Sequence, residues 1–497
     1  MKSTKPMVVV YAVAAALSLS TSLLGGPQYG GRQSEDSQSG GGQNGGNGGP
    51  QSSTTTARDP GVRSDAVTVG NPVSGIAGDQ LEYFNEGLVR FMEVDSVSGS
   101  LPGEPGVGLG PGFNSNSCGN CHAQPGPGGS SPSLNDYPHI GSNPQIAVAN
   151  ADQGTNRIPF FVTPDGPVRE ARFPFMVSPS GALTQVPDGG VHDLFTIQGR
   201  NDALGCQMAQ PNFAQMQQLG NLIFRIPTPV FGAGLIENIP DATILANMNT
   251  SAQLKQALGI TGHPNYSGND GTITRFGWKA QNKSLEIFAG EAYNVEQGVT
   301  NELFPDERGA PPSCMINKTP EDSTNFNQSG VQFPSDLVEF AAFMRFLAPP
   351  APSAAGIPGN PSPRTIQQGQ QAFLQAHCDL CHTPAMQTGS SALATGLSQQ
   401  NAALYSDLLV HNMGSNLADN VSQGAAGADE FRTAPLWGVG QRIFFLHDGR
   451  ATPANGGLLR AIEAHSGPGS EANGVISLFN NLTNQQQQDL LFFLRSL

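Results

Sequence analysis

Apolar residues recur at helical spacing in a few segments of this chain, and polar or loop-forming residues fill the long stretches between them. The clearest pattern predicts a helix over residues 79–93, where Leu81 and Phe84 begin the apolar face. Asp79 and Glu82 have the spacing of a capping box at its start. Comparable patterns predict further helices over residues 336–347, 366–374 and 493–497 and over the amphipathic stretch that follows Trp278.

Strand signals are fewer and weaker. Short β-prone runs at residues 159–163 and 222–226 are the candidates. Residues 231–237 contain a Gly-x-Gly, but they lack the third glycine and the strand-to-helix context of a dinucleotide site. We therefore interpret them as a tight turn.

Two short runs carry the chemistry of the chain, because each has the form Cys-x-x-Cys-His. In such a run both thiols can add to the vinyl groups of one haem, and the next imidazole can ligate the iron. A zinc site or a redox-active thiol pair is the alternative, but zinc would require both pairs to converge and would leave the histidines unused. The runs predict two covalently bound c-type haems, attached through Cys118, Cys121, Cys378 and Cys381 and ligated by His122 and His382.

The same order of elements surrounds both runs, with an apolar helix before each and another at the end of the module. Such a helix pair typically encloses the haem of a cytochrome c. The expected fold is mainly α, with two cytochrome c-like haem modules, a large loop-rich insertion in the first and few short strands. We divide the chain into residues 1–25 (signal peptide or N-terminal anchor), 26–65 (disordered spacer), 66–347 (N-terminal haem module), 348–363 (Pro-rich linker) and 364–497 (C-terminal haem module).

Composition agrees with this fold and narrows the partners. Gly (62) and Pro (39) are abundant and charged residues make up 13%, as in short helices separated by ordered loops. The net charge of −15 argues against a nucleic-acid partner, because no basic stripe could neutralise phosphates. It favours a small, basic electron-donor protein instead.

The first residues have the pattern of an export signal, since Lys2 and Lys5 precede an apolar run at residues 7–24. We expect an exported, periplasmic protein, with an uncleaved membrane tether as the alternative. Export would permit a disulfide between the remaining cysteines, Cys206 and Cys314. Two separate buried thiols are the other reading.

Several segments resemble the di-haem oxidoreductases, which are related to bacterial di-haem cytochrome c peroxidases. The resemblance runs from about residue 78 to the C-terminus, and it is clearest at residues 192–200, 292–305, 433–438 and 445–465. The last segment has an aromatic-x-His-Asp-Gly run and an Ala-Ile helix. Beyond that helix the peroxidases have a ligating Met, and a relative that matures the methylamine dehydrogenase cofactor has a Tyr. The resemblance implies that His465 ligates the second haem here, with Met413 and His411 as alternatives.

The resemblance also implies roles for Trp278 and Glu296. In the peroxidases a Trp lies between the haems, and a Glu beside the first haem moves a proton between the two oxygens of peroxide. Otherwise Trp278 is a core residue and Glu296 an ion-paired carboxylate. Glu291 is the alternative base, and His139 is a candidate displaceable ligand of the first haem. The peroxidases also hold a calcium ion, whose ligands this sequence does not reveal.

Three functions are compatible with this resemblance. The leading one is reduction of hydrogen peroxide, or of another small oxidant, with electrons from a small donor protein relayed between two haems. The second is oxidation of a partner protein or organic substrate through high-valent haem, and the third is non-enzymatic electron transfer. The sixth position of each iron separates them, because a second strong ligand makes a relay whereas an open position admits peroxide.

Overall fold

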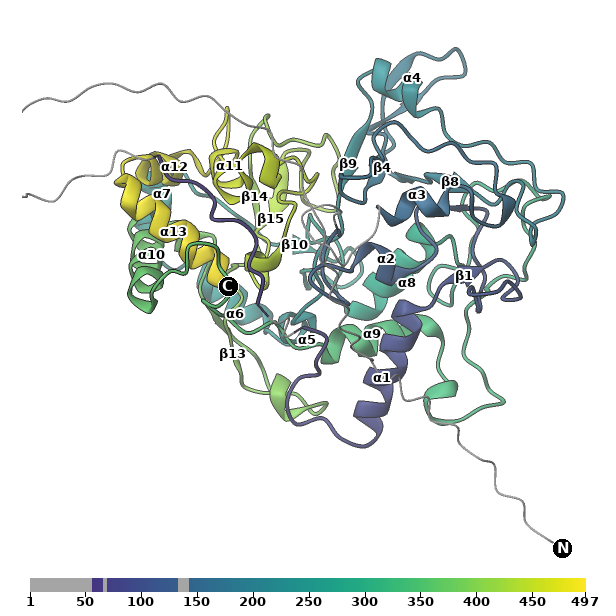
Figure 1. Ribbon diagram of the computed structural model, residues 1–497, viewed down its shortest axis with the longest axis horizontal. Coiled ribbons are helices and arrows are strands. Elements are labelled where there is room, and N and C mark those ends of the chain that lie inside the picture. Colours follow the sequence, from purple (N-terminus) through teal and green to yellow (C-terminus); the bar gives the residue numbers. More distant parts are fainter. Residues whose placement is uncertain (1–55, 66–68, 133–142) are drawn as a thin grey trace, which may run out of the picture. The chain divides into compact units, whose positions relative to one another are not determined.

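The computed structural model describes residues 56–65, 69–132 and 143–497 (Figure 1). The predicted signal segment, most of the predicted spacer and His139 lie outside these residues. Within them, no helix is both long and apolar enough to cross a membrane. Residues from Thr54 to the C-terminus belong to one compact unit.

Helices are the commoner regular element, at 31% of the described residues against 13% for strands, so most of the described part is loop. The α-helices of the described part are α1 (Asp79–Met92), α2 (Cys118–Cys121), α3 (Pro144–Val148), α4 (Phe213–Gln218), α5 (Ala233–Glu237), α6 (Asp241–Met248), α7 (Ala252–Leu258), α8 (Leu285–Glu296), α9 (Asp336–Phe346), α10 (Pro363–Gln375), α11 (Gly457–Glu463), α12 (Asn473–Asn480) and α13 (Asn484–Ser496). The 3₁₀ turns are η1 (Ala151–Gln153), η2 (Gly330–Gln332), η3 (Cys378–Leu380), η4 (Thr395–Leu397), η5 (Val439–Gln441) and η6 (Pro453–Asn455).

Strands are short but more numerous than the sequence suggested. They are β1 (Asp95–Ser96), β2 (Gly106–Val107), β3 (Gly112–Phe113), β4 (Glu170–Arg172), β5 (Phe175–Val177), β6 (Leu183–Pro187), β7 (Val191–His192), β8 (Phe195–Thr196), β9 (Ile223–Arg225), β10 (Asn265–Tyr266), β11 (Ile273–Thr274), β12 (Met386–Gln387), β13 (Asn401–Ala402), β14 (Val410–Asn412) and β15 (Glu430–Arg432). They pair mostly in twos, and one three-stranded antiparallel sheet has the order β7-β4-β9. This sheet belongs to the region predicted as an insertion.

The helix predictions are confirmed by α1, α8, α9, α10 and α13, and the strand predicted at residues 222–226 is confirmed by β9. Three details are wrong. Residues 159–163 form no strand, and residues 231–237 end in the helix α5 rather than in a turn alone. The capping box is absent because Gly78, with φ 55°, occupies the N-cap, so Asp79 and Glu82 lie in the first turn, where they favour the helix dipole.

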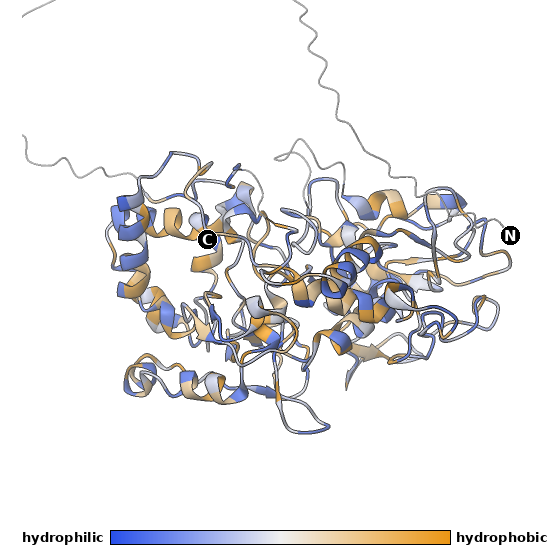
Figure 2. Ribbon diagram, turned by 90° about the horizontal axis from the view of Figure 1, so that it is seen from below, coloured by the Kyte–Doolittle hydropathy of each residue, from blue (hydrophilic) through white to orange (hydrophobic). Residues whose placement is uncertain are grey.

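Two helix pairs are built alike, α1 with α9 and α10 with α13 (Figure 1). In each pair a glycine of the first helix meets a backbone carbonyl of the second. A Cβ on Gly87 would collide with the carbonyl of Glu339, and a Cβ on Gly369 with that of Asp489. Both pairs therefore depend on a residue without a side chain for close approach. In Figure 2 the helices carry both hydrophobic and hydrophilic positions, as expected for helices that pack on one side only.

Three buried apolar clusters support these elements. One surrounds α1, α5, α8 and α9, and another surrounds α10, α11 and α13. The third fills the region around β4 and β9, and it contains a disulfide between Cys206 and Cys314. The bond joins positions 108 residues apart and closes onto itself the segment that runs from α4 to α8.

Residues 56–65, which the sequence placed at the end of the spacer, pack against the C-terminal part of the chain. Ala57 is buried with α10 and α13, and Asp59 pairs with the fully buried Arg495 of α13 at 2.6 Å. Composition alone cannot reveal such a contact, because the partner lies at the other end of the chain.

Candidate functional site

A first cavity lies beside α2 and encloses about 1080 Å³, including its mouth. Cys118, Cys121 and His122 all line it, as the Cys-x-x-Cys-His reading requires. Its apolar wall includes Phe91 from α1 and Phe340 from α9. Among the described lining residues His122 is the only histidine.

A second cavity, of about 1460 Å³ including its mouth, lies beside η3. Cys378, Cys381 and His382 line it together with His465.

Each proximal histidine is held by the same kind of aromatic contact. The ring of Phe91 lies 5.9 Å from His122 and 4.8 Å from Phe343 of α9, measured between centroids. The ring of Phe373 in α10 lies 6.5 Å from His382, and it contacts Phe493 of α13 at 5.6 Å. The two helix pairs thus orient the two histidines in equivalent ways.

Each of these histidines bonds a backbone carbonyl through Nδ1, and the backbone of Thr228 also contacts His122. The Nδ1 atom of His122 lies 3.0 Å from the carbonyl oxygen of Gly129, and that of His382 lies 2.9 Å from the carbonyl oxygen of Tyr405. Burial lowers the pKa of each ring to about 4, so both are neutral at pH 7. A neutral ring that donates through Nδ1 presents an unprotonated Nε2, which is the form that binds a metal.

His465 has the same arrangement on the other side of the second cavity. Its Nδ1 atom lies 2.7 Å from the carbonyl oxygen of Ala461, and its ring centroid lies 6.5 Å from that of His382. Two imidazoles that bind one metal from opposite sides at about 2.1 Å each hold their centroids a little over ~6 Å apart. The observed separation therefore suits a pair of axial ligands.

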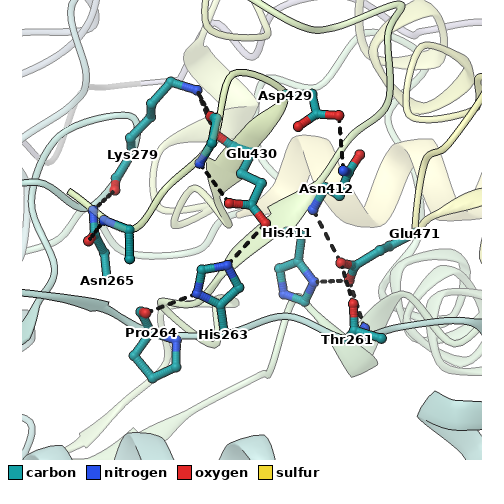
Figure 3. A network of polar contacts seen from close by, with 12 residues as sticks. Thr261, His263, Pro264, Asn265, Lys279, His411, Asn412, Asp429, Glu430 and Glu471 are labelled. Atoms are coloured by element: carbon teal, nitrogen blue, oxygen red, sulfur yellow. Dashed lines mark hydrogen bonds and ion pairs between the residues drawn. The ribbon is translucent and has the colours of Figure 1, made fainter. Parts of the chain in front are cut away.

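His411, the alternative to His465, also lines the second cavity but has no free ring nitrogen. The Nε2 atom of His411 lies 2.9 Å from a carboxylate oxygen of Asp407, and its Nδ1 atom lies 2.9 Å from one of Glu471. The hydroxyl of Thr261 donates to the same Glu471 carboxylate (Figure 3). Burial opposes the charge of this ring, whereas the Cys381 sulfur and Asp407 raise the pKa of His411 well above its usual range; once Cys381 is joined to haem, only the effect of Asp407 remains. Because Asp407 and Glu471 occupy both ring nitrogens, His411 offers no nitrogen to iron. The other alternative, Met413, lines the same cavity.

Trp278 lines both cavities. Its indole Nε1 donates to the carbonyl oxygen of Ile226 at 2.8 Å, and the backbone nitrogen of Ile226 donates to the carbonyl oxygen of His447 at 2.8 Å. His447 belongs to the wall of the second cavity and meets the indole edge-on at 6.4 Å. The sequence placed Trp278 between two haems, and the structure places it between the two cavities.

Glu296 lies at the end of α8 and lines the first cavity, whereas Glu291 does not. Asn282 donates to the Glu291 carboxylate, so this alternative base is engaged elsewhere. Sequence reasoning missed three charged neighbours of Glu296, namely Glu170, Arg172 and Arg225. They come from strands β4 and β9, too short to give a periodic signal.

The cavities also carry cations suited to the propionates of a haem. Arg442 and Arg432 line the second cavity, and burial lowers the pKa of each to about 10. Nη2 of Arg442 is buried without a hydrogen-bond partner among the described residues, although its guanidinium lies over the Trp278 ring at 5.8 Å. Arg169, in the first cavity, has a buried Nε without a partner. A buried guanidinium without a full set of partners costs free energy unless a bound anion pairs with it, so these residues fit the propionates of a haem.

The described residues offer no group of oxygen ligands suited to calcium. Within the described ranges, the one group of three ligand-type side chains close enough to share an ion is Cys381, Asp407 and His411, at the second cavity. His411 is charged there, and calcium prefers oxygen ligands.

Comparison with known proteins agrees with these observations. The model of the family described as "Di-haem oxidoreductase, putative peroxidase" matches residues 189–497. No curated protein matches the chain. Among solved structures, hydrazine synthase of Kuenenia stuttgartiensis, pressurised with 20 bar xenon, is 14% identical over 55% of this chain and 73% of its own, with a TM-score of 0.27. A MauG-like protein associated with microbial copper homeostasis is 16% identical over 55% of this chain and 90% of its own, also with a TM-score of 0.27. At these identities and TM-scores neither structure supports an assignment for this chain.

Proposed function

This chain belongs to the di-haem oxidoreductase family, and from that premise we propose that it is an exported enzyme that reduces hydrogen peroxide with electrons relayed between two covalently bound haems. Haem cofactors follow from the family itself. The covalent attachment, the substrate, the electron donor and the location are our proposals.

The main support for the proposal is a difference between the histidines that line the two cavities. The second cavity offers two neutral histidines, His382 and His465, at a separation that suits two axial ligands. The first offers His122 alone among its described histidines, together with the Glu296 carboxyl. A doubly ligated iron suits electron storage, whereas an iron with one strong ligand can admit a substrate. Met344 also lines the first cavity, so the spin state of the first iron is the measurement that separates this proposal from simple electron transfer.

The protein residues would divide the work as follows. A bound haem supplies an iron that takes up and gives up one electron at a time. His122 and His382 hold their rings in fixed orientations through Nδ1, and Phe91 and Phe340 keep water from the apolar side of the first cavity. Glu296 would carry a proton between the peroxide oxygens, and Trp278 would lie on the path between the cavities.

The repeated helix pairs support a fold of two cytochrome c-like haem modules. Gly87 and Phe343 in the first pair correspond to Gly369 and Phe493 in the second, and each pair orients the histidine of one Cys-x-x-Cys-His run. We therefore propose modules at residues 66–347 and 364–497, joined by residues 348–363.

The location and the partners are inferred from the disulfide, the N-terminal apolar run and the net charge. The Cys206–Cys314 disulfide suits an oxidising compartment such as the periplasm, and the apolar N-terminal run suits export or a membrane tether. The net charge of −15 suits a basic donor protein and disfavours nucleic acid.

The test is peroxide turnover by the purified two-haem protein with a reduced small electron-donor protein. We expect a high-spin ferric signal by electron paramagnetic resonance, and donor oxidation that depends on peroxide. Glu296→Gln should lower kcat/KM for peroxide by about 10²- to 10⁴-fold without changing the resting spectrum. The matched control is Glu291→Gln, a glutamate of the same helix outside the cavity, which should retain turnover.

Two outcomes would count against the proposal. Low-spin signals alone, oxidised and after one-electron reduction, would indicate an electron-transfer cytochrome. Peroxide consumption that oxidises an added organic molecule but never the donor protein would favour the second enzymatic reading.

A further inference from the structure

Charged side chains gather on one face of the sheet β7-β4-β9, at the wall of the first cavity. Residues alternate between the two faces of a strand, so Glu170 and Arg172 point the same way from β4, while Ala171 between them is buried in the adjacent core. The register pairs Glu170 directly with Arg225 across β4 and β9. All three charged residues line the first cavity together with Glu296.

Two guanidinium groups hold Glu170 ionised. The Nε atom of Arg172 lies 2.6 Å from a carboxylate oxygen of Glu170, and Arg225 faces it across the sheet. Burial opposes ionisation, but Arg172 and Arg225 outweigh it and keep the pKa of Glu170 below its usual range. Arg225 is itself bound by the buried Asp419 at 2.5 Å, so Arg172 is the main partner of Glu170.

Glu296 has the opposite environment, although its carboxyl group hydrogen-bonds to that of Glu170. Burial and the negative charge of Glu170 raise the pKa of Glu296 well above its usual range. Arg172 and Arg308 act in the other direction, but Arg308 is occupied by Asp193 at 3.0 Å. The proton of the pair therefore lies on Glu296, whose hydroxyl donates to the Glu170 carboxylate. The other ionisable group that acts on this cluster is Glu291, through Arg172; Cys118 and Cys121 lie near it but carry no charge once they are joined to haem.

We propose that Glu170 is a positioning residue that, fixed by Arg172, keeps Glu296 protonated and aims its acidic proton, so that the first cavity presents a carboxyl pair holding a single proton. The catalytic role of this pair rests on the proposed peroxide reduction. The pair itself follows from the sheet register and the contacts of the two carboxyl groups.

The proton movements balance in such a pair. As the O–O bond breaks, Glu296 would give its proton to the departing oxygen, which leaves as water, and the other oxygen would return its proton to Glu296. The pair ends with the one proton it began with. Overall, peroxide takes two electrons from the donor protein and two protons from solvent and yields two waters.

The test is titration of the protonated carboxyl group by infrared difference spectroscopy on the oxidised, haem-loaded protein, alongside the pH profile of kcat/KM. We expect the native-minus-Glu296→Gln difference at pH 7 to contain a protonated-carboxyl band, separate from those of other buried carboxyls such as Asp95 and Glu339, whose pKa values burial also raises. In Glu170→Gln the band should vanish at lower pH than in the native protein. The alkaline limb of kcat/KM should move to lower pH with it, with a loss of about tenfold at pH 7. Glu170→Asp, which keeps the charge, should restore part of both.

A matched control and a second variant keep the test decisive. Glu237→Gln breaks a similar carboxylate–arginine pair, with Arg345 at 2.7 Å and outside both cavities, and should titrate as the native protein does. Arg172→Gln should add a second protonated carboxyl at pH 7, because Glu170 loses its main cation.

Several results would overturn the inference. A native protein without a protonated-carboxyl band at pH 7 would do so, as would a Glu170→Gln variant that titrates like the native protein. If Glu170→Gln does not fold, an unchanged band in Arg172→Gln would have the same force. Absence of peroxide turnover would refute the proposed function alone, because the infrared titration does not depend on it.

Discussion

Removal of the Cys206–Cys314 disulfide should cost several kcal/mol of stability, because the bond closes a very long loop. With the two cysteines 108 positions apart in sequence, the loss of loop entropy in the unfolded chain corresponds to about 5 kcal/mol at 25 °C. Both sulfurs are buried, at 2% and 1% exposure, so alanine is the suitable replacement. For a unit that spans Thr54–Leu497, an unfolding entropy of about 0.9 kcal/mol/K makes this a fall of about 5 °C in Tm.

Thermal unfolding of the haem-loaded protein, followed by circular dichroism, would measure the change. Cys206→Ala and Cys314→Ala should each cost nearly the full amount, and the double variant should cost little more, because one bond is lost in all three. The native protein in reductant should approach the same Tm. If the two single costs add in the double variant, or if reductant has no effect, the cysteines are independent buried thiols and the entropic reasoning fails.

Three further predictions test the second cavity and the path between the cavities. Trp278→Phe should slow electron transfer between the haems by about tenfold, equivalent to ~1.4 kcal/mol in the barrier, in stopped-flow reduction, whereas Trp437→Phe, which changes a tryptophan outside both haem cavities, should not. His465→Ala should convert the low-spin signal of the second iron to high spin, and an unchanged spectrum would mean that another residue is the ligand. His411→Gln should lower the free energy of unfolding by about 3–5 kcal/mol near pH 6, because Asp407 and Glu471 lose their cation. His411 holds the pKa of Glu471 at about 2 against the effect of burial, and the pKa of His411 is itself raised. This stabilisation should therefore disappear as pH falls from about 4 towards 2, and also as pH rises through the raised pKa of His411; unfolding curves that show no such dependence would contradict it.

The sequence was informative where the signal is local. A Cys-x-x-Cys-His run fixes the spacing of thiols and imidazole within five residues, and it brings Cys118, Cys121 and His122 to one cavity. Helical periodicity likewise predicted α1 and α10, because an amphipathic helix repeats its apolar positions within a few turns.

Contacts between distant segments could not be predicted in this way. Glu170 meets Glu296 only because β4 pairs with β9 and their sheet faces the end of α8. A three-residue strand shows no alternation that stands out from a loop, so Glu170 carried no signal of its own. The same limit explains Asp59, whose partner Arg495 lies near the other end of the chain. The capping-box prediction failed for a different reason, because Gly78 adopts the positive φ that begins the helix one residue earlier.

The two cavities are built on similar helix pairs but differ in the polar side chains that line them. Each has a helix pair brought close by a glycine, and each has two phenylalanines beside a histidine whose Nδ1 donates to a backbone carbonyl. In the second cavity the opposite wall supplies another neutral histidine, His465. In the first, the three-stranded sheet places Glu170 and Arg172 beside Glu296 on the cavity wall. The catalytic role proposed for the first cavity therefore depends on this sheet, and variants of Glu170 and Arg172 should change peroxide turnover while leaving the His382–His465 pair of the second cavity intact.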